Sequence, residues 1–140
     1  MKFTRKASAL WKGSGKDGKG VLTTASKTLE NTPYSFHSRF EDGKGTNPEE
    51  LIGAAHAGCF AMQLSFLLGE AGFTPTSLDV AATVTFEDGS ITLITLNLKG
   101  DIPKIPNDKF KEIARKAKEV CPISKLLKTK IELELSLIQK

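Results

Sequence analysis

The chain has two cysteines, Cys59 and Cys121, and their thiols are the side chains best suited to covalent chemistry. A thiolate is a nucleophile that peroxides oxidise to a sulfenic acid, which a second thiol can convert to a disulfide. A purely structural disulfide rarely persists in a reducing compartment. Two cysteines in such a compartment are therefore inert core residues, metal ligands or a redox-active pair.

Cys59 follows a turn rich in alanine and glycine, residues 53–58, which leaves open space over its sulfur and favours a reactive thiol. The pattern fits a small apolar core residue equally well, since free cysteine is among the most buried residue types. His56 lies three residues before Cys59, so the two are neighbours on a helix. A Cys–His nucleophile pair for hydrolysis is a further possibility, although a packed or hydrogen-bonded histidine is the simpler explanation.

Cys121 precedes Pro122 and a short run that predicts a helix at residues 122–127. A cysteine just outside a helix N-terminus feels partial positive charge, which can lower the pKa of its thiol. The ordinary alternative is a corner between two helices. Helix-end electrostatics thus favours Cys121 at least as strongly as Cys59 for the reactive role, and leaves the two roles unassigned.

Charged residues that could activate a thiol occur shortly before Cys59, at Arg39, Glu49 and Glu50. The guanidinium of Arg39 could stabilise a thiolate and orient a peroxide oxygen. Glu49, in the first turn of a predicted helix, could hold Arg39 in a bidentate pair. Each also has an ordinary explanation, because acidic residues compensate the helix dipole and an arginine is commonly a solvated surface charge.

Motifs for metals, phosphates and nucleic acids are weak. The chain has two histidines, His37 and His56, but neither HxxxH nor CxxC spacing occurs, so a structural zinc site is not expected. The glycines and lysines of residues 13–20 lack the Walker spacing and fit a flexible hairpin turn. The net charge of +4 comes with scattered lysines, so no nucleic-acid partner is predicted. No metal or organic cofactor is expected.

Length and composition are typical of one globular domain over residues 1–140. Apolar residues make up 39% and charged residues 26%, which excludes a disordered chain. We find no apolar stretch of membrane-spanning length, and residues 1–6 are basic without the apolar core of a signal peptide. A soluble, cytoplasmic protein without a membrane partner is therefore expected.

The clearest predicted element is a helix that begins at Asn47 and ends at residues 69–72. Asn47 suits the N-cap, and Pro48 suits the first helical position. The helix is apolar nearly all round, which predicts a buried central helix. Hairpins separated by helices predict the α+β class, with mainly antiparallel sheets around that helix. Further helices are predicted at 107–120 and 122–127, and extended segments at 1–11, 21–24, 32–40, 78–86, 91–98 and 130–138.

This sequence resembles the osmotically inducible protein C family, and its osmotically inducible branch more than its organic hydroperoxide resistance branch. The resemblance covers nearly the whole chain, in order, with both cysteines in place. Gly58 departs from the family pattern, in which alanine is common. The resemblance rests on residues 39–41, 45–60, 69–76 and 117–124, and on Trp11, Pro33 and Tyr34.

The resemblance implies a bacterial thiol peroxidase that reduces organic hydroperoxides, and hydrogen peroxide less well. Cys59 would be the peroxidatic cysteine, Cys121 the resolving cysteine, and Arg39 and Glu49 the residues that activate the thiolate. It also implies an intertwined homodimer with active sites at the subunit interface, and a dithiol reductant such as a lipoyl group on a carrier protein. The alternatives are a hydrolase using Cys59 and His56, and a non-enzymatic, stress-related binding dimer with inert cysteines.

Overall fold

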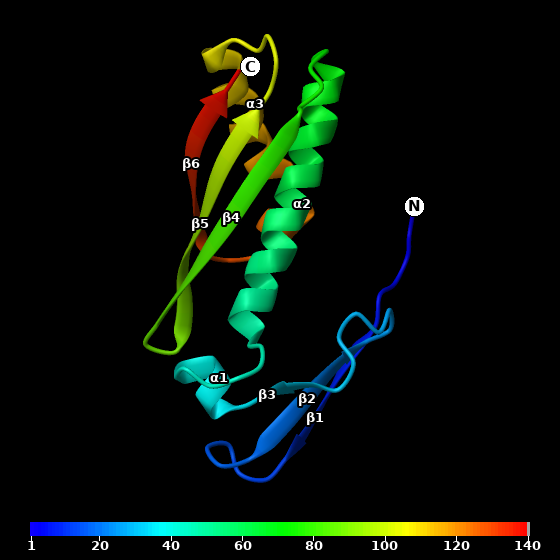
Figure 1. Cartoon of the computed structure of the whole chain (residues 1–140), viewed down its shortest axis with the longest axis vertical. Helices are drawn as coiled ribbons and strands as arrows, with labels where there is room; N and C mark the ends of the chain where they lie inside the picture. The colour runs from blue at the N-terminus through cyan, green and yellow to red at the C-terminus, as the bar shows by residue number, and fades with distance from the viewer. Residues whose placement is uncertain (140) are drawn as a thin grey trace. The chain divides into compact units, whose positions relative to one another are not determined.

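The structure, a computed structural model, describes residues 1–139, and the chain forms two compact units, Met1–Leu51 and Ile52–Lys140. Helix α2 (Pro48–Glu70) begins in the first unit and contributes most of its length to the second. Figure 1 shows the order of the elements along the chain. Each unit has its own three-stranded sheet.

The first unit is an antiparallel sheet of β1 (Ala7–Lys12), β2 (Lys19–Thr24) and β3 (Thr32–Tyr34), with β2 in the centre. Gly20 of β2 pairs with Trp11 on one side and with Tyr34 on the other. A Cβ atom at Gly20 would lie 2.4 Å from the Tyr34 ring and 2.6 Å from the Trp11 ring. The missing side chain therefore lets the two rings approach across the strand, to 5.4 Å between their centroids.

The chain after β3 is helical, which corrects the prediction of an extended segment over residues 32–40. Helix α1 (Phe36–Phe40) begins with a capping box. The N–H of Ser35 donates to Oγ of Ser38, and the N–H of Ser38 donates to Oγ of Ser35. The alternating aromatics on either side of Ser35 imitate a strand, and serine in place of glutamate at the third helical position hides the helix start.

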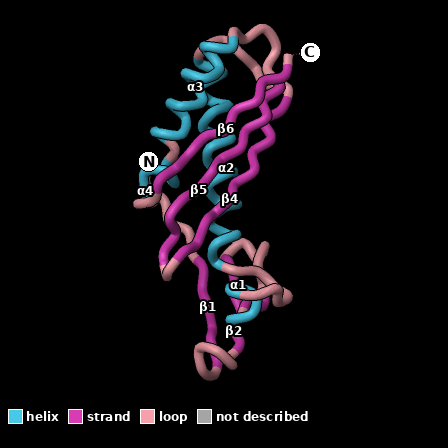
Figure 2. The backbone as a smooth tube through the Cα atoms, turned by 90° about the vertical axis from the view of Figure 1, so that its left-hand side faces the viewer, coloured by secondary structure: helices cyan, strands magenta, loops and turns pink. Residues whose placement is uncertain are grey.

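The second unit is a sheet of β4 (Ser77–Glu87), β5 (Ser90–Asp101) and β6 (Lys130–Ile138), covered on one face by helices. β4 and β5 form the predicted antiparallel hairpin, whereas β6 pairs with β5 in parallel. The chain between β5 and β6 passes through α3 (Asn107–Val120) and α4 (Pro122–Leu126), a crossover of the kind that parallel strands require (Figure 2). The α+β class with mainly antiparallel sheets is thus confirmed, with one parallel pair that was not predicted.

The core of the second unit lies between its sheet and its helices. In β5, Ile94, Leu96 and Leu98 alternate inward and are fully buried. Helix α3 faces this core with an apolar stripe, and its bounds match the predicted helix. Cys121, at the end of α3, is fully buried in the same cluster. The core therefore fixes the place of one of the two thiols.

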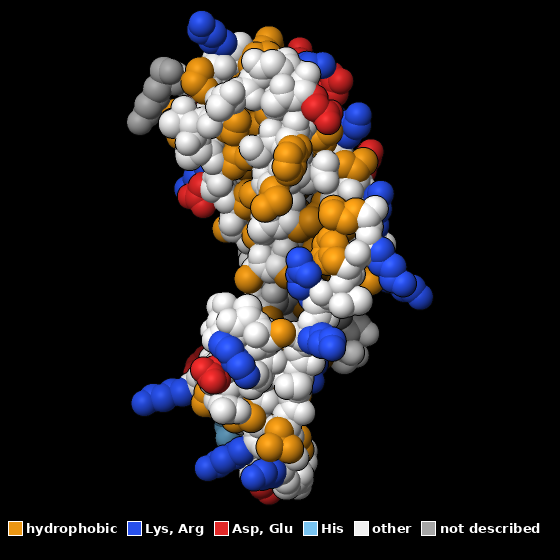
Figure 3. Space-filling model, turned by 90° about the vertical axis from the view of Figure 1, so that its right-hand side faces the viewer, with side chains coloured by type: hydrophobic (Ala, Val, Ile, Leu, Met, Phe, Trp, Pro, Cys, Tyr) orange, Lys and Arg blue, Asp and Glu red, His pale blue; other side chains and the backbone are white. Residues whose placement is uncertain are grey.

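Helix α2 begins as predicted but is less buried than its composition suggests. Asn47 caps it, since its Oδ1 accepts the N–H of Glu50 at 2.8 Å. Met62 and Phe66 are 65% and 67% exposed, and Figure 3 shows that hydrophobic side chains reach the surface on one face of the molecule. The prediction of a helix buried all round is therefore wrong for a single chain. The buried stripe consists of Gly53, His56, Phe60, Leu64 and Leu68.

Helix α2 is also long and apolar enough to span a membrane by length and composition alone, which corrects the expectation that no apolar stretch is so long. Only 28% of its most apolar window is buried within the chain. Core helices of soluble proteins pass the same test, and the buried stripe of α2 contributes to the core cluster as such helices do. Length and composition therefore do not by themselves assign α2 to a membrane.

Candidate functional site

The fold brings the two cysteines together. Their Sγ atoms lie 3.0 Å apart, although 62 residues separate them in sequence, and both are free thiols. Cys59 lies in the middle of α2 and is partly exposed, whereas Cys121 lies at the corner between α3 and α4 and is fully buried. A disulfide needs a separation of about 2.05 Å, so a small local movement is enough to join the two sulfurs.

The surroundings of Cys59 act on its ionisation in opposite directions. Burial raises the pKa of the Cys59 thiol, and the neighbouring thiol of Cys121 raises it further. The backbone N–H of Ile123, in the first turn of α4, hydrogen-bonds to Cys59 and lowers its pKa, but the net shift is upward. These contacts together favour the protonated thiol, and a positive charge placed near Cys59 would favour the thiolate.

Open space lies along α2 just before Cys59. Gly58 is exposed, and a Cβ atom added there would meet nothing within 4 Å. The space beside Gly58 is therefore open, whereas Gly53 of the same run is buried, with Val84 3.3 Å from where its Cβ would lie.

The same space makes Gly58 replaceable. Because alanine favours the helix over glycine by about 1 kcal/mol, Gly58→Ala is expected to raise the free energy of unfolding by roughly that amount. Urea denaturation followed by circular dichroism measures it. A fall in stability would mean that another chain or segment packs closely on this position.

His56 is engaged with α4 rather than with Cys59. It is fully buried, and its Nε2 is hydrogen-bonded to Oγ of Ser124 at 2.8 Å. Burial lowers the pKa of His56, so the ring is neutral at pH 7. This arrangement differs from the Cys59–His56 pair that a hydrolase would use, in which the ring bonds to the thiol.

Arg39 and Glu49 form an ion pair in the first unit. The Nε and NH2 nitrogens of Arg39 approach the same oxygen, Oε1 of Glu49, at 2.9 and 2.8 Å. The other carboxylate oxygen, Oε2, is buried and has no hydrogen-bond partner within residues 1–139. The pair therefore uses one carboxylate oxygen and leaves the other buried without a partner among the described residues. Glu50 has a local role instead, since it accepts from Oγ1 of Thr46 at 2.7 Å.

An aromatic cavity lies next to Arg39 and was not predicted from the sequence. Its volume is about 230 Å³, and the guanidinium is its charged group. Aromatic walls around a cation suit a ligand with an apolar body and a polar head. The aromatic residues come from strands and a helix that only the fold brings together. They are Trp11, Tyr34, Phe36 and Phe40.

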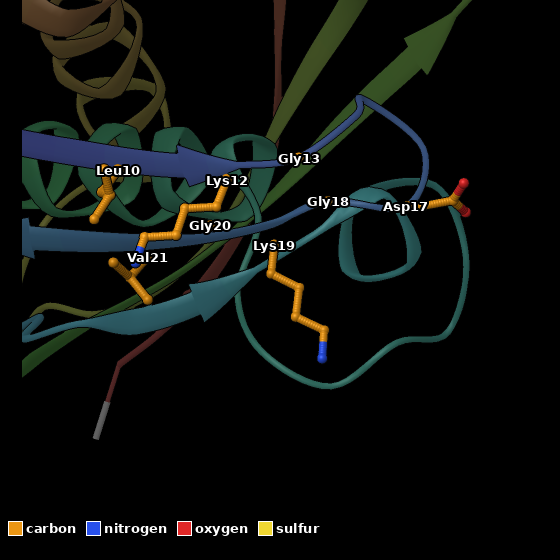
Figure 4. Close-up of a pocket in the computed structure, with 8 residues that line it drawn as sticks. All are labelled: Leu10, Lys12, Gly13, Asp17, Gly18, Lys19, Gly20 and Val21. Atoms are coloured by element: carbon orange, nitrogen blue, oxygen red, sulfur yellow. The ribbon is translucent and has the colours of Figure 1, made fainter.

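A larger pocket of about 440 Å³ lies along the β1–β2 hairpin, and Figure 4 shows its lining. Leu10 and Val21 contribute apolar side chains, and Lys12 and Lys19 contribute charges. No thiol lines this pocket. Its size therefore does not make it the site of the cysteine chemistry.

The described residues include no cluster of side chains that could bind a metal ion. Within residues 1–139, no group of three or more histidine, cysteine or acidic side chains gathers as metal ligands would. His37 is paired with Glu41 through its Nδ1. The two cysteines are paired with each other.

The geometry agrees with several similarities to known proteins. The family model described as OsmC-like protein matches residues 41–136. Peroxiredoxin OsmC of Escherichia coli strain K12 is 48% identical over 141 residues, which cover 98% of this chain and 99% of that protein. An organic hydroperoxide resistance protein-like protein of Staphylococcus aureus strain USA300 is 30% identical over 102 residues, 68% of this chain and 71% of that protein. The crystal structure of the organic hydroperoxide resistance protein OhrB of Bacillus subtilis has a TM-score of 0.69 and 25% identity, and the match covers 97% of this chain and 98% of that chain.

Proposed function

This chain belongs to the OsmC family and is a thiol peroxidase, and we propose that Cys59 is its peroxidatic cysteine and Cys121 its resolving cysteine. The observation that carries this assignment is the 3.0 Å separation of the two sulfurs. A peroxide reaches Cys59 first because Cys121 is fully buried. A buried thiol suits the second role, since it has to meet only the oxidised sulfur.

In the first step the Cys59 thiolate attacks the distal oxygen of a hydroperoxide. An S–O bond forms, the O–O bond breaks, and the alkoxide takes up a proton to leave as an alcohol. In the second step the Cys121 sulfur attacks the sulfenic acid, so that an S–S bond forms and hydroxide leaves as water after protonation. The two cysteines together lose two electrons, which reduce the peroxide. A dithiol then restores both thiols by exchange, so the cycle uses no metal or organic cofactor.

The Cys59 thiol needs an activating charge because burial raises its pKa. We propose that Arg39 supplies this charge and that Glu49 holds its guanidinium in place. The Arg39–Glu49 pair belongs to the first compact unit and Cys59 to the second. A second copy of the chain is the proposed source of the pair, in an intertwined homodimer with its active sites at the subunit interface.

The exposed apolar side of α2 supports this homodimer. Met62 and Phe66 are mostly exposed in the single chain, and large exposed apolar patches usually mark an interface. A second α2 helix is an apolar partner for this surface. In the proposed dimer, a second α2 helix covers the exposed apolar side of α2. The same second chain supplies the Arg39 guanidinium to Cys59.

Organic hydroperoxides are the proposed preferred substrates, with hydrogen peroxide reduced less well. The hydrocarbon part would occupy the aromatic cavity next to Arg39, with the peroxide oxygens toward the guanidinium. Hydrogen peroxide has no apolar part and gains nothing from that cavity.

The proposed reductant is a dithiol, such as a dihydrolipoyl group on a carrier protein, which would reach the disulfide from the partly exposed Cys59 side. Free thiols and a thiol-based cycle suit the reducing cytoplasm, and no nucleic-acid or membrane partner is proposed. The two compact units would function as one domain over residues 1–140, because the similarity to the Escherichia coli protein spans 98% of the chain.

Mass spectrometry of the reduced protein after one equivalent of cumene hydroperoxide tests the assignment. The expected product is a peptide pair joined through Cys59 and Cys121. Two unmodified thiols would overturn the proposal and would leave the binding dimer with inert cysteines as the better explanation. Dimedone labelling is the complementary test, since it traps a sulfenic acid at the cysteine that reacts first.

A further inference from the structure

A hydrogen bond joins α2 to α4 beside the thiol pair. Nε2 of His56 and Oγ of Ser124 are hydrogen-bonded at 2.8 Å, across 68 residues of sequence. His56 precedes Cys59 by three residues on α2, and Ser124 follows Cys121 by three residues in α4. The hydrogen bond therefore lies about one helical turn from the thiol pair on each helix.

Helix α4 depends on its surroundings for its position. It has five residues, none of them fully buried, and Cys121 at its N-cap makes no side-chain capping bond. A helix this short is not stable by itself. The apolar side chains of Ile123 and Leu127 pack on the core, and the hydroxyl of Ser124 adds a directional bond to α2.

A histidine at position 56 lowers the stability of the core. His56 is 0% exposed, and its Nδ1 is buried without a hydrogen-bond partner in the described part of the chain. A buried polar group lowers stability when its hydrogen bonds are incomplete. A leucine would continue the apolar stripe of α2 without that cost, so packing alone does not explain the histidine.

We propose that the His56–Ser124 hydrogen bond positions α4 so that Cys121 closes rapidly onto the oxidised Cys59. This inference rests on the proposed peroxidatic and resolving roles of the two cysteines. When Cys59 gains an oxygen, its contact with Cys121 has to give way to an S–S bond of about 2.05 Å. The anchored helix holds the attacking sulfur within reach while the S–O bond breaks.

Rapid closure also protects Cys59. A sulfenic acid that waits for its partner can react with a second peroxide and become a sulfinic acid, which a dithiol does not reduce. His56 and Ser124 contact neither the peroxide nor the reacting atoms in this scheme. They are positioning residues whose effect appears in the second step and not in the first.

Ser124→Ala tests the proposal, with Ser124→Thr as the conservative variant that keeps a hydroxyl. Ser136→Ala, at an exposed position of β6, is the matched control. Each reduced protein is mixed with one equivalent of cumene hydroperoxide, and quenched samples are analysed for peroxide consumed and for the Cys59–Cys121 disulfide. Ser124→Ala is expected to consume peroxide within about twofold of the wild-type rate and to close the disulfide about tenfold more slowly. Ser124→Thr and Ser136→Ala are expected to close it at nearly the wild-type rate.

A double variant separates positioning from stability. His56→Leu combined with Ser124→Ala replaces both partners by apolar groups, which can restore the melting temperature that a single replacement lowers. Disulfide closure is expected to stay slow, and excess peroxide is expected to convert more Cys59 to the sulfinic acid than in the wild type. Closure at the wild-type rate in Ser124→Ala or in the double variant would overturn the inference, as would a failure of threonine to restore it. Failure of the proposed function is distinguishable, because the wild-type protein itself would then form no Cys59–Cys121 disulfide.

Discussion

Cys59→Ser is expected to abolish peroxide consumption, with a loss of about a thousandfold or more. A serine hydroxyl stays protonated at neutral pH and cannot cycle through a sulfenic acid. The loss is measured as the disappearance of cumene hydroperoxide in the presence of a dithiol. Residual turnover near the wild-type rate would show that Cys121 is the thiol that reacts first.

Cys121→Ser is the matched control for this prediction. It keeps Cys59 and is expected to consume about one equivalent of peroxide per chain, as the wild type does without added reductant. The product should be a sulfenic acid at Cys59 that dimedone traps, with loss of recycling through the disulfide. Full peroxide turnover in Cys121→Ser would instead show that the added dithiol reduces the Cys59 sulfenic acid directly, without a resolving cysteine in the chain.

Arg39→Gln is expected to lower kcat/KM for organic hydroperoxides by about 100- to 1000-fold, the range for loss of one preorganised charge at a reacting centre. Without the guanidinium, the pKa of Cys59 stays at the value that burial and Cys121 raise, so the rate should recover partly as the pH becomes alkaline. Glu49→Gln is expected to cost less, about tenfold, because it loosens Arg39 without removing its charge. Arg115→Gln, at an exposed position of α3, is the control and should leave the rate and its pH profile unchanged.

Mixed dimers test which chain supplies the arginine. If Arg39 acts on Cys59 of the other subunit, a dimer of one Cys59→Ser chain and one Arg39→Gln chain contains one complete site. Co-expression of the two inactive variants with different tags, followed by purification through both tags, should then give about half of the wild-type activity per dimer. Inactive mixed dimers would show that Arg39 and Cys59 act within one chain.

The parts of the fold that were predictable are those that local chemistry determines. Asn107–Val120 and Lys130–Ile138 have the predicted bounds because their apolar residues repeat at one period and their ends carry clear breakers. Helix α1 was not predicted, because its five residues are too few to show a period. The parallel pairing of β6 with β5 was not predictable either, since it depends on where the crossover through α3 and α4 returns the chain.

Some features of the candidate site were likewise predictable from the sequence, and others were not. The two cysteines stood out by residue type, but nothing in their spacing places their sulfurs 3.0 Å apart, because that contact depends on packing between α2 and the α3–α4 corner. The Arg39–Glu49 pair formed as expected, although both nitrogens use one carboxylate oxygen. The bond between His56 and Ser124 had a weak signal in the sequence, since each residue lies three positions from a cysteine. That signal becomes meaningful only once the two cysteines are known to meet.

The long stretch of chain between Cys59 and Cys121 has a consequence for heat resistance. The 62-residue separation includes β4, β5 and α3, and so most of the core of the second unit. A disulfide that closes a loop of this size restricts the unfolded chain and stabilises the fold by roughly 4 kcal/mol in the chain-entropy estimate. The oxidised protein should therefore melt at a higher temperature than the reduced one. Exposure to peroxide would therefore make the chain more resistant to unfolding. The reductant that restores its activity would also return it to the form with the lower melting temperature.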